Sequence, residues 1–110
     1  MKFKIITSLY FVKNLKQLAK KYPSITDDIA KLAENLKENP LEGTPLGKDC
    51  YKIRMAITSK NKGKSGGSRV ITCVKIVAQT VILLSIYDKS EMETITDDDL
   101  SELLSLAGIE

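Results

Sequence analysis

The stretch Tyr51-Lys52-Ile53-Arg54-Met55-Ala56-Ile57-Thr58 is the part of the chain that decides the expected fold. Its apolar side chains alternate with the others, which is the period of a β-strand that buries one face. Lys52 and Arg54 therefore project together from the opposite face of this strand. Residues 70–77 and 81–87 are also rich in β-branched and apolar residues, and hairpin connections between consecutive strands predict a small antiparallel sheet.

Two amphipathic helices are predicted before this sheet. Residues 2–7 favour a short strand, and from residue 8 the apolar side chains recur on one face of a helix that Pro23 ends. The same spacing returns over residues 25–36, so two short helices form a hairpin that is expected to cover one face of the sheet. Residues 39–47 carry several Gly and Pro and are interpreted as an irregular connection.

A third helix is predicted near the end of the chain. Thr96 is followed by three consecutive Asp residues, a capped helix start whose carboxylates lie at the positive end of the helix dipole. The predicted order is therefore β-α-α-β-β-β-α. This is an α+β fold in a single domain that spans residues 1–110.

The composition limits the possible functions. The chain contains no histidine, which excludes a Ser-His-Asp or Cys-His catalytic site and any His-ligated metal. Catalysis near neutral pH would depend on Lys, Arg, Tyr or carboxylates, and neither a metal nor a cofactor is predicted. Cys50 and Cys73 lack metal-ligand spacing and are expected to be buried free thiols. The chain has no apolar run of transmembrane length and its start lacks the features of a signal peptide, so a cytoplasmic protein without a membrane partner is predicted.

Positive charge is concentrated in the middle of the chain. Between Asp49 and Asp88 there is no acidic residue, whereas this span contains seven cations, Lys52, Arg54, Lys60, Lys62, Lys64, Arg69 and Lys75. Cations on adjacent strands and on the loop between them suit a nucleic-acid phosphate backbone, and Gly66-Gly67 lets backbone amides approach an anion. The alternative interpretation is a solvated hairpin loop with ordinary surface charge.

Several of these residues could act on a phosphate. Arg69 is the first candidate, because a guanidinium group holds a phosphate through two parallel hydrogen bonds; a salt bridge to the acidic C-terminal segment is the alternative. Lysines crowded by other cations have a lowered pKa, so Lys52, Lys62 or Lys64 could accept or donate a proton. Tyr87 could supply a phenol or stack on a base, or simply pack in the core.

Residues 50–54, 60–71 and 83–91 together resemble the RelE/ParE superfamily of bacterial toxins. The chain is most similar to the RelE-like HigB branch, in which a Gly-Lys-x-Gly-Gly-x-Arg segment follows a Lys-Ile-Arg strand and a Tyr-x-Lys-x-Glu-Met segment ends the last strand. The order of elements fits along nearly the whole chain.

This resemblance implies a ribosome-dependent mRNA endonuclease that inhibits translation without metal and is neutralised by a cognate antitoxin. In such a toxin the ribose 2′-hydroxyl attacks the adjacent phosphate and leaves a cyclic phosphate. By position, the resemblance assigns catalytic roles to Lys52, Arg69 and Lys89, with Lys62 and Tyr87 as further candidates for proton transfer. The general base stays open, because Glu91-Met92-Glu93 stands where RelE has a tyrosine. The remaining cations of the group, Arg54, Lys60, Lys64 and Lys75, are assigned to RNA binding.

Two other functions remain open. ParE-like relatives share the fold and poison DNA gyrase, which would make this chain a protein-binding toxin. The third possibility is a nucleic-acid-binding module without catalytic activity. The number of cations in the loop favours the RNA-cleaving interpretation over gyrase binding.

Overall fold

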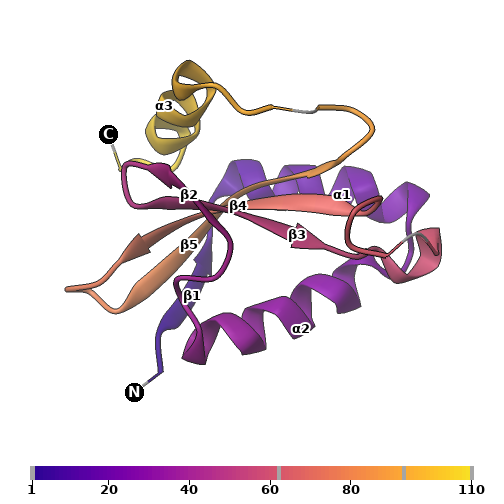
Figure 1. Ribbon diagram of the computed structural model, residues 1–110, viewed down its shortest axis with the longest axis horizontal. Helices are drawn as coiled ribbons and strands as arrows, with labels where there is room; N and C mark the ends of the chain where they lie inside the picture. The colour runs from indigo at the N-terminus through magenta and orange to yellow at the C-terminus, as the bar shows by residue number, and fades with distance from the viewer. Residues whose placement is uncertain (1, 62, 93, 110) are drawn as a thin grey trace.

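A five-stranded sheet with the order β1-β5-β4-β3-β2 forms the middle layer of the protein (Figure 1). The structure is a computed structural model and describes residues 2–61, 63–92 and 94–109. The strands are β1 (Lys4–Thr7), β2 (Thr44–Gly47), β3 (Cys50–Met55), β4 (Ser68–Lys75) and β5 (Thr80–Asp88). The helices are α1 (Leu9–Lys21), α2 (Ile25–Glu38), the short 3₁₀ helix η1 (Thr58–Lys60) and α3 (Asp97–Leu106). The predicted α+β class is thus confirmed.

The sheet is mixed, which refines the antiparallel prediction. The pairs β2–β3, β3–β4 and β4–β5 are antiparallel, whereas β1 lies parallel to β5 at the edge of the sheet. The hairpin rule fixes the direction of consecutive strands only, and β1 pairs with the strand that is farthest from it in the sequence.

Residues 44–47 form an edge strand, where an irregular connection was predicted. Pro45 is compatible with this position because only one side of an edge strand needs backbone donors. Gly47 has a φ of 89° and accompanies an irregularity in the pairing with β3. The Gly and Pro residues that indicated a loop are therefore features of a short, bulged edge.

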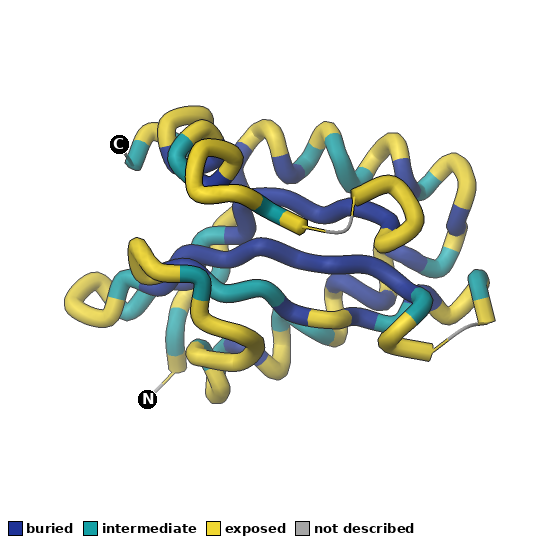
Figure 2. Tube along the Cα trace, turned by 45° about the horizontal axis from the view of Figure 1, so that its top comes forward, coloured by how far each residue is buried: buried dark blue, intermediate teal, exposed yellow. Residues whose placement is uncertain are grey.

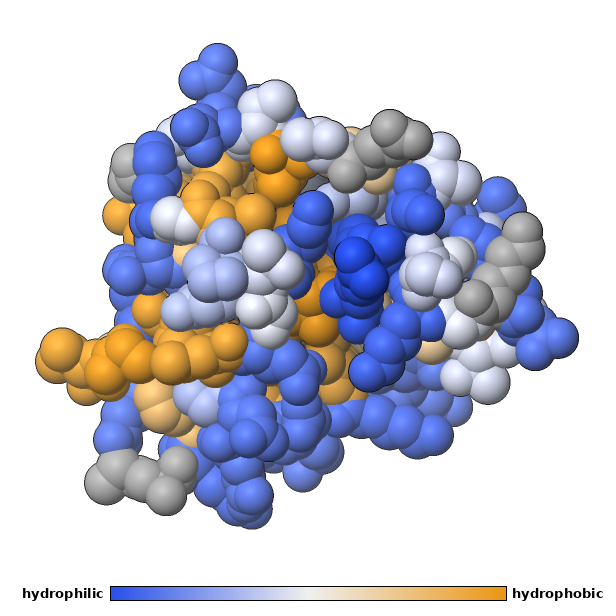
Figure 3. Space-filling view, in the orientation of Figure 1, coloured by the Kyte–Doolittle hydropathy of each residue, from blue (hydrophilic) through white to orange (hydrophobic). Residues whose placement is uncertain are grey.

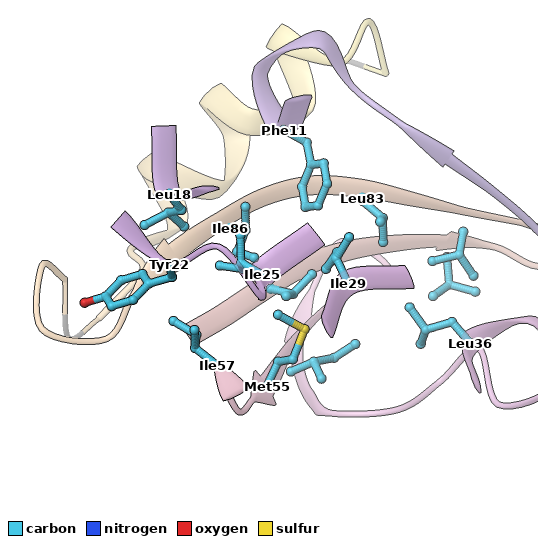
Figure 4. Packing of buried hydrophobic residues seen from close by; sticks show 14 residues of the cluster. Phe11, Leu18, Tyr22, Ile25, Ile29, Leu36, Met55, Ile57, Leu83 and Ile86 are labelled. Atoms are coloured by element: carbon cyan, nitrogen blue, oxygen red, sulfur yellow. The ribbon is translucent and has the colours of Figure 1, made fainter. Parts of the chain in front are cut away.

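The two predicted N-terminal helices cover one face of the sheet. Their buried residues, among them Phe11, Leu18, Ile25, Ile29 and Leu36, pack on apolar residues of β3, β4 and β5 (Figure 4). Ser8 caps α1 by accepting a hydrogen bond from the Phe11 amide at 3.0 Å.

Helix α3 lies on the opposite face of the sheet and covers only part of that face. Its residues Leu100, Leu103 and Leu104 pack on Cys50, Ile71, Cys73 and Leu84. Both cysteines are buried thiols and neither forms a disulfide, as predicted. Because Cys50 begins β3 and Cys73 lies near the end of β4, most of this cluster lies at the strand ends farthest from residues 60–67, here called the basic loop. Tyr87 of β5 also belongs to the cluster and lies nearer to that loop. Figure 2 shows that β4 is buried along nearly its whole length. Within the described residues, no helix has the length and apolar character needed to cross a membrane.

Candidate nucleic-acid interface

Three of the predicted site residues form a row across three strands. Arg54 of β3 lies opposite Arg69 of β4, and Arg69 lies opposite Tyr87 of β5. Residues directly opposite each other on neighbouring strands project from the same face of a sheet. Lys52, two positions before Arg54 on β3, projects from that face as well. The structure therefore brings four of the predicted site residues together beside α3, and Figure 3 shows strongly hydrophilic side chains over β3 in this view.

Arg69 is the buried member of this row. Its exposed fraction is only 7%, and its guanidinium group donates hydrogen bonds to the carbonyls of Lys64 (3.0 Å), Ser65 (3.2 Å) and Ser68 (3.0 Å). In the part of the chain that the structure describes, no carboxylate is paired with Arg69, so the alternative of a salt bridge to the C-terminal segment finds no support there. The guanidinium group is thus held inside the protein by backbone carbonyls, and phosphate binding by Arg69 stays a prediction.

The loop before Arg69 is held close to the end of β3. A Cβ atom at Gly67 would lie 2.4 Å from the Met55 carbonyl oxygen, and Ser68 Oγ donates to the same oxygen at 3.1 Å. The Gly67 amide donates to the Lys64 carbonyl at 3.4 Å. Glycine at position 67 is thus required for a close approach of two backbones, and its amide is used inside the loop rather than left for an anion.

Tyr87 has a buried hydroxyl group with no hydrogen-bond partner among the described residues. Burial raises the pKa of its phenol; the nearby Arg69 lowers this pKa and Asp99 raises it further, with a net upward shift. The phenol is therefore protonated near neutral pH, and its side chain packs in the core cluster of α3 with Leu100 and Leu103, as the core-packing alternative predicted. A role of Tyr87 in proton transfer stays a prediction.

Two of the predicted RNA-binding lysines have partners inside the protein. Lys60 Nζ lies 2.7 Å from Asp88 Oδ1, and the Lys60 side chain is only 14% exposed. Lys75 Nζ lies 3.7 Å from Asp49 Oδ2, at the end of β4 opposite to Arg69. Phosphate binding by Lys60 would require breaking a buried ion pair, and Lys75 does not belong to the row.

The remaining predicted cations lie at the edge of the row. Lys64 is exposed in the basic loop, and Lys89 is exposed just after β5, where its backbone amide donates to the Gly67 carbonyl at 3.1 Å. This hydrogen bond ties Lys89 to the end of the basic loop. Lys62 lies outside the described residues.

Sequence reasoning missed two buried carboxylates that hold the segment after β3. Asp28 accepts hydrogen bonds from the Thr58 amide (3.0 Å), Thr58 Oγ1 (2.6 Å) and Ser24 Oγ (3.0 Å). Burial alone would raise the pKa of Asp28, but these hydrogen bonds outweigh it and the pKa is lowered. Asp88 likewise holds Lys60, whose Nζ donates a hydrogen bond to Asp88 Oδ1. No local pattern reveals either contact, because the partners are 28 and 30 residues apart.

The comparisons with known proteins agree with this architecture. The family model described as "RelE toxin of RelE / RelB toxin-antitoxin system" matches residues 7–109. The chain belongs to the RelE toxin family. The superfamily that residues 50–54, 60–71 and 83–91 indicated is thereby confirmed, whereas the HigB branch stays a prediction.

Solved RelE structures share the fold at low sequence identity. A RelE double mutant from E. coli in the free state has a TM-score of 0.61 and 18% identity, and the alignment covers 98% of this chain and 96% of that chain. The chain in the RelBE2 toxin-antitoxin complex from Mycobacterium tuberculosis has a TM-score of 0.61 and 17% identity, with 80% and 99% covered. Isolated E. coli RelE has a TM-score of 0.59 and 17% identity, with 94% and 96% covered. A comparison with curated protein sequences finds no match.

Two hollows flank the row in this RelE-family chain. A cleft of about 360 Å³ lies between α1, β5 and the segment after β5, and its lining includes Tyr87 and Glu91. A groove of about 380 Å³ lies between α2, β3 and the basic loop, and brings Lys31 of α2 near Arg54 and Lys64. Lys31 is a further cation that the sequence did not single out, since an exposed helical lysine has no distinguishing pattern. Among the described residues, no group of three or more His, Cys, Asp and Glu side chains could hold a metal ion.

Proposed function

We propose that this RelE-family toxin is an endoribonuclease that cleaves mRNA on the ribosome without a metal ion. The observation that supports this most directly is the row of Arg54, Arg69 and Tyr87 across three strands, with Lys52 on the same face. It combines cations for a phosphate with a protonated phenol and no carboxylate in the row itself. Cleavage by an internal 2′-hydroxyl uses such cations and a proton donor, together with a base that accepts the 2′-hydroxyl proton.

The reaction would proceed by attack within the RNA. The ribose 2′-oxygen forms a bond to the adjacent phosphorus and loses its proton to a base, for which Lys52 and Lys62 are the candidates. Negative charge then develops on the pentacoordinate phosphorus, where Arg69 and Arg54 would stabilise it. The bond from phosphorus to the 5′-oxygen breaks, and this oxygen takes a proton from Tyr87 or Lys89. The products are a 2′,3′-cyclic phosphate and a free 5′-hydroxyl.

Fixed donors are what make such a site effective. Arg69 is held by three backbone carbonyls, so its guanidinium group does not have to be ordered when the substrate binds. Exposed cations, Lys64 at the rim and Lys31 in the groove beside α2, would guide the RNA backbone towards the row.

A cognate antitoxin is the proposed protein partner. The RelBE2 structure is a toxin-antitoxin complex, and this RelE-family chain has the fold of a chain in that complex. We expect an antitoxin to cover the cationic face or to displace an element near it. The ribosome and mRNA are the other proposed partners, and the cytoplasm is the proposed location.

The test is expression of the gene with and without the adjacent reading frame, which we expect to encode the antitoxin. Primer extension on cellular mRNA then maps the RNA ends. We expect translation to stop and new 5′ ends to appear within ribosome-bound messages. Arg69→Ala should reduce cleavage by roughly 100- to 1,000-fold, the cost typical of one lost transition-state donor. Lys37→Ala is the matched control, because Lys37 is paired with Glu34 on the exposed end of α2. DNA breaks in place of RNA ends would indicate a ParE-like gyrase poison, and neither kind of break would indicate a binding module without catalytic activity.

A further inference from the structure

Asp88 is a fully buried carboxylate that accepts hydrogen bonds from three different parts of the chain. Its exposed fraction is 0%. The Tyr22 hydroxyl donates to Oδ2 at 2.6 Å, while Lys60 Nζ (2.7 Å) and the Ser90 amide (3.0 Å) donate to Oδ1. Lys60 also lies 5.6 Å from the centre of the Tyr22 ring. One carboxylate thus joins the end of α1, the helix η1 and the segment that leaves β5.

The position of Asp88 on β5 fixes the direction of Tyr87. Consecutive residues of a strand project from opposite faces of the sheet. With the Asp88 carboxylate bound among Tyr22 and Lys60 on the α1 side, Tyr87 is held on the face that carries Arg54 and Arg69. Any rotation of this strand end would move both side chains together.

Asp88 also joins the two ends of the basic loop. Lys60 stands where the loop begins, and Gly67 stands where it ends. The Lys89 amide, next to Asp88 in the chain, donates to the Gly67 carbonyl at 3.1 Å. The ion pair at one end and this hydrogen bond at the other hold the loop, and with it Lys64, close to the row.

We propose that Asp88 is a positioning residue of the toxin's reaction, which aligns Tyr87, Lys89 and the basic loop through its bonds to Lys60, Tyr22 and Ser90. The proposal rests on the endoribonuclease function above. It assigns to Lys60 a role in holding the loop in place of direct phosphate binding.

If Asp88 only stabilised the fold, the activity of its variants would follow their stability. A buried ion pair can often be replaced by apolar residues of similar volume without loss of stability. Such a replacement keeps the packing but removes the hydrogen bonds that set the direction of the strand end and the loop. Activity and stability should therefore separate in this protein.

The experiment compares Asp88→Asn and the double variant Lys60→Met/Asp88→Leu with the wild type. The control is Asp49→Asn, which removes the exposed partner of Lys75 at the other end of the sheet. Each variant is measured for kcat and KM on ribosome-bound mRNA, at a temperature where denaturant unfolding shows it to be folded. In Asp88→Asn and in the double variant we expect kcat to fall by about 10- to 100-fold, as for a misplaced catalytic group, with KM changed less than about threefold. Asp49→Asn should keep the wild-type kcat. Lys60→Arg, which keeps a cation beside Asp88, should retain most of the wild-type kcat.

A second readout does not depend on activity. Hydrogen exchange at the Lys89 amide and trypsin cleavage within residues 60–64 should be faster in Asp88→Asn than in the wild type and unchanged in Asp49→Asn. Wild-type kcat together with wild-type exchange in folded Asp88→Asn would overturn the proposal. A kcat loss that only follows the unfolded fraction would do so as well. If Asp88→Asn does not fold, Tyr22→Phe removes one of the bonds and should show the same separation of kcat from KM. A wild-type protein that cleaves no RNA would instead refute the proposed function, and the exchange data would then decide whether Asp88 holds the loop.

Discussion

Arg54 and Arg69 occupy directly opposite positions on β3 and β4, so their side chains project from neighbouring strands on the same face. Like charges placed opposite each other destabilise a sheet. Asp88 and Asp28, the nearby buried acids, are bound to other partners. An anion bound between the two arginines would relieve their repulsion, and an RNA phosphate is such an anion.

Arg54→Ala should separate stability from activity. Removing one of two opposed cations is expected to leave the free energy of unfolding unchanged or raise it by about 0.2–1 kcal/mol. Cleavage should nevertheless fall, since Arg54 is exposed and free to contact a phosphate. Urea unfolding and mRNA cleavage measure the two effects, with Lys37→Ala as the control. A marked loss of stability in Arg54→Ala would contradict the interpretation of Arg54 as a functional residue.

Gly67→Ala should disturb the basic loop. The added Cβ would lie 2.4 Å from the Met55 carbonyl oxygen, and backbone atoms on both sides would have to move. We expect the free energy of unfolding to fall by about 1–3 kcal/mol, the usual cost of overpacking, and cleavage to fall with it. Ser65→Ala, at an exposed position of the same loop, is the control and should behave as the wild type. Unfolding curves that coincide for Gly67→Ala and the wild type would show that the loop accommodates the added methyl group without loss of stability.

Asp88 should make stability depend on pH in the acid range. Burial alone would raise its pKa, but the hydrogen bonds from Lys60, Tyr22 and Ser90 outweigh it and hold the pKa below its usual range. A carboxyl group with a lowered folded-state pKa stabilises the protein above its unfolded-state pKa of about 3.9, and this contribution is lost as the pH falls through the folded-state value. Asp88→Asn should therefore be much less stable than the wild type at pH 7, with the difference shrinking below about pH 4.

The ion pair also sets an alkaline limit. Asp88 raises the pKa of Lys60, so the stabilisation by Lys60 is complete below its unfolded-state pKa of about 10.4 and is lost as the pH rises through the folded-state value.

The acid dependence predicted for Asp88 is measured by urea unfolding of the wild type, Asp88→Asn and Asp49→Asn from pH 2.5 to pH 7. Equal stability differences for Asp88→Asn at both ends of this range would contradict the lowered pKa.

The sequence predicted the parts of the site that depend on local periodicity. Alternation over residues 51–58 placed Lys52 and Arg54 on one face, and the order of consecutive strands placed Arg69 beside them. The parallel pairing of β1 with β5 was out of reach, because no local pattern relates strands so far apart in the sequence.

Long-range polar contacts were equally hidden. Lys60 has the same local context as Lys64, a lysine in a basic loop, yet one binds Asp88 and the other is exposed. Only the folded sheet brings position 88 beneath the loop. Charge counting thus grouped cations of which two, Lys60 and Lys75, are paired with carboxylates inside the protein.

Lys31→Ala should weaken RNA binding without altering chemistry. Lys31 lies on α2 and shares a groove of about 380 Å³ with Arg54 and Lys64, so it would meet the RNA backbone beyond the row. Each phosphate contact of a single-stranded RNA contributes about 0.7 to the slope of log K against log salt concentration. We therefore expect Lys31→Ala to reduce this slope by about that amount, to weaken binding at low salt and to leave kcat unchanged at saturating substrate. Lys37→Ala, on the same helix but paired with Glu34, should keep the wild-type slope. Identical slopes for Lys31→Ala and the wild type would place the RNA path elsewhere on the surface.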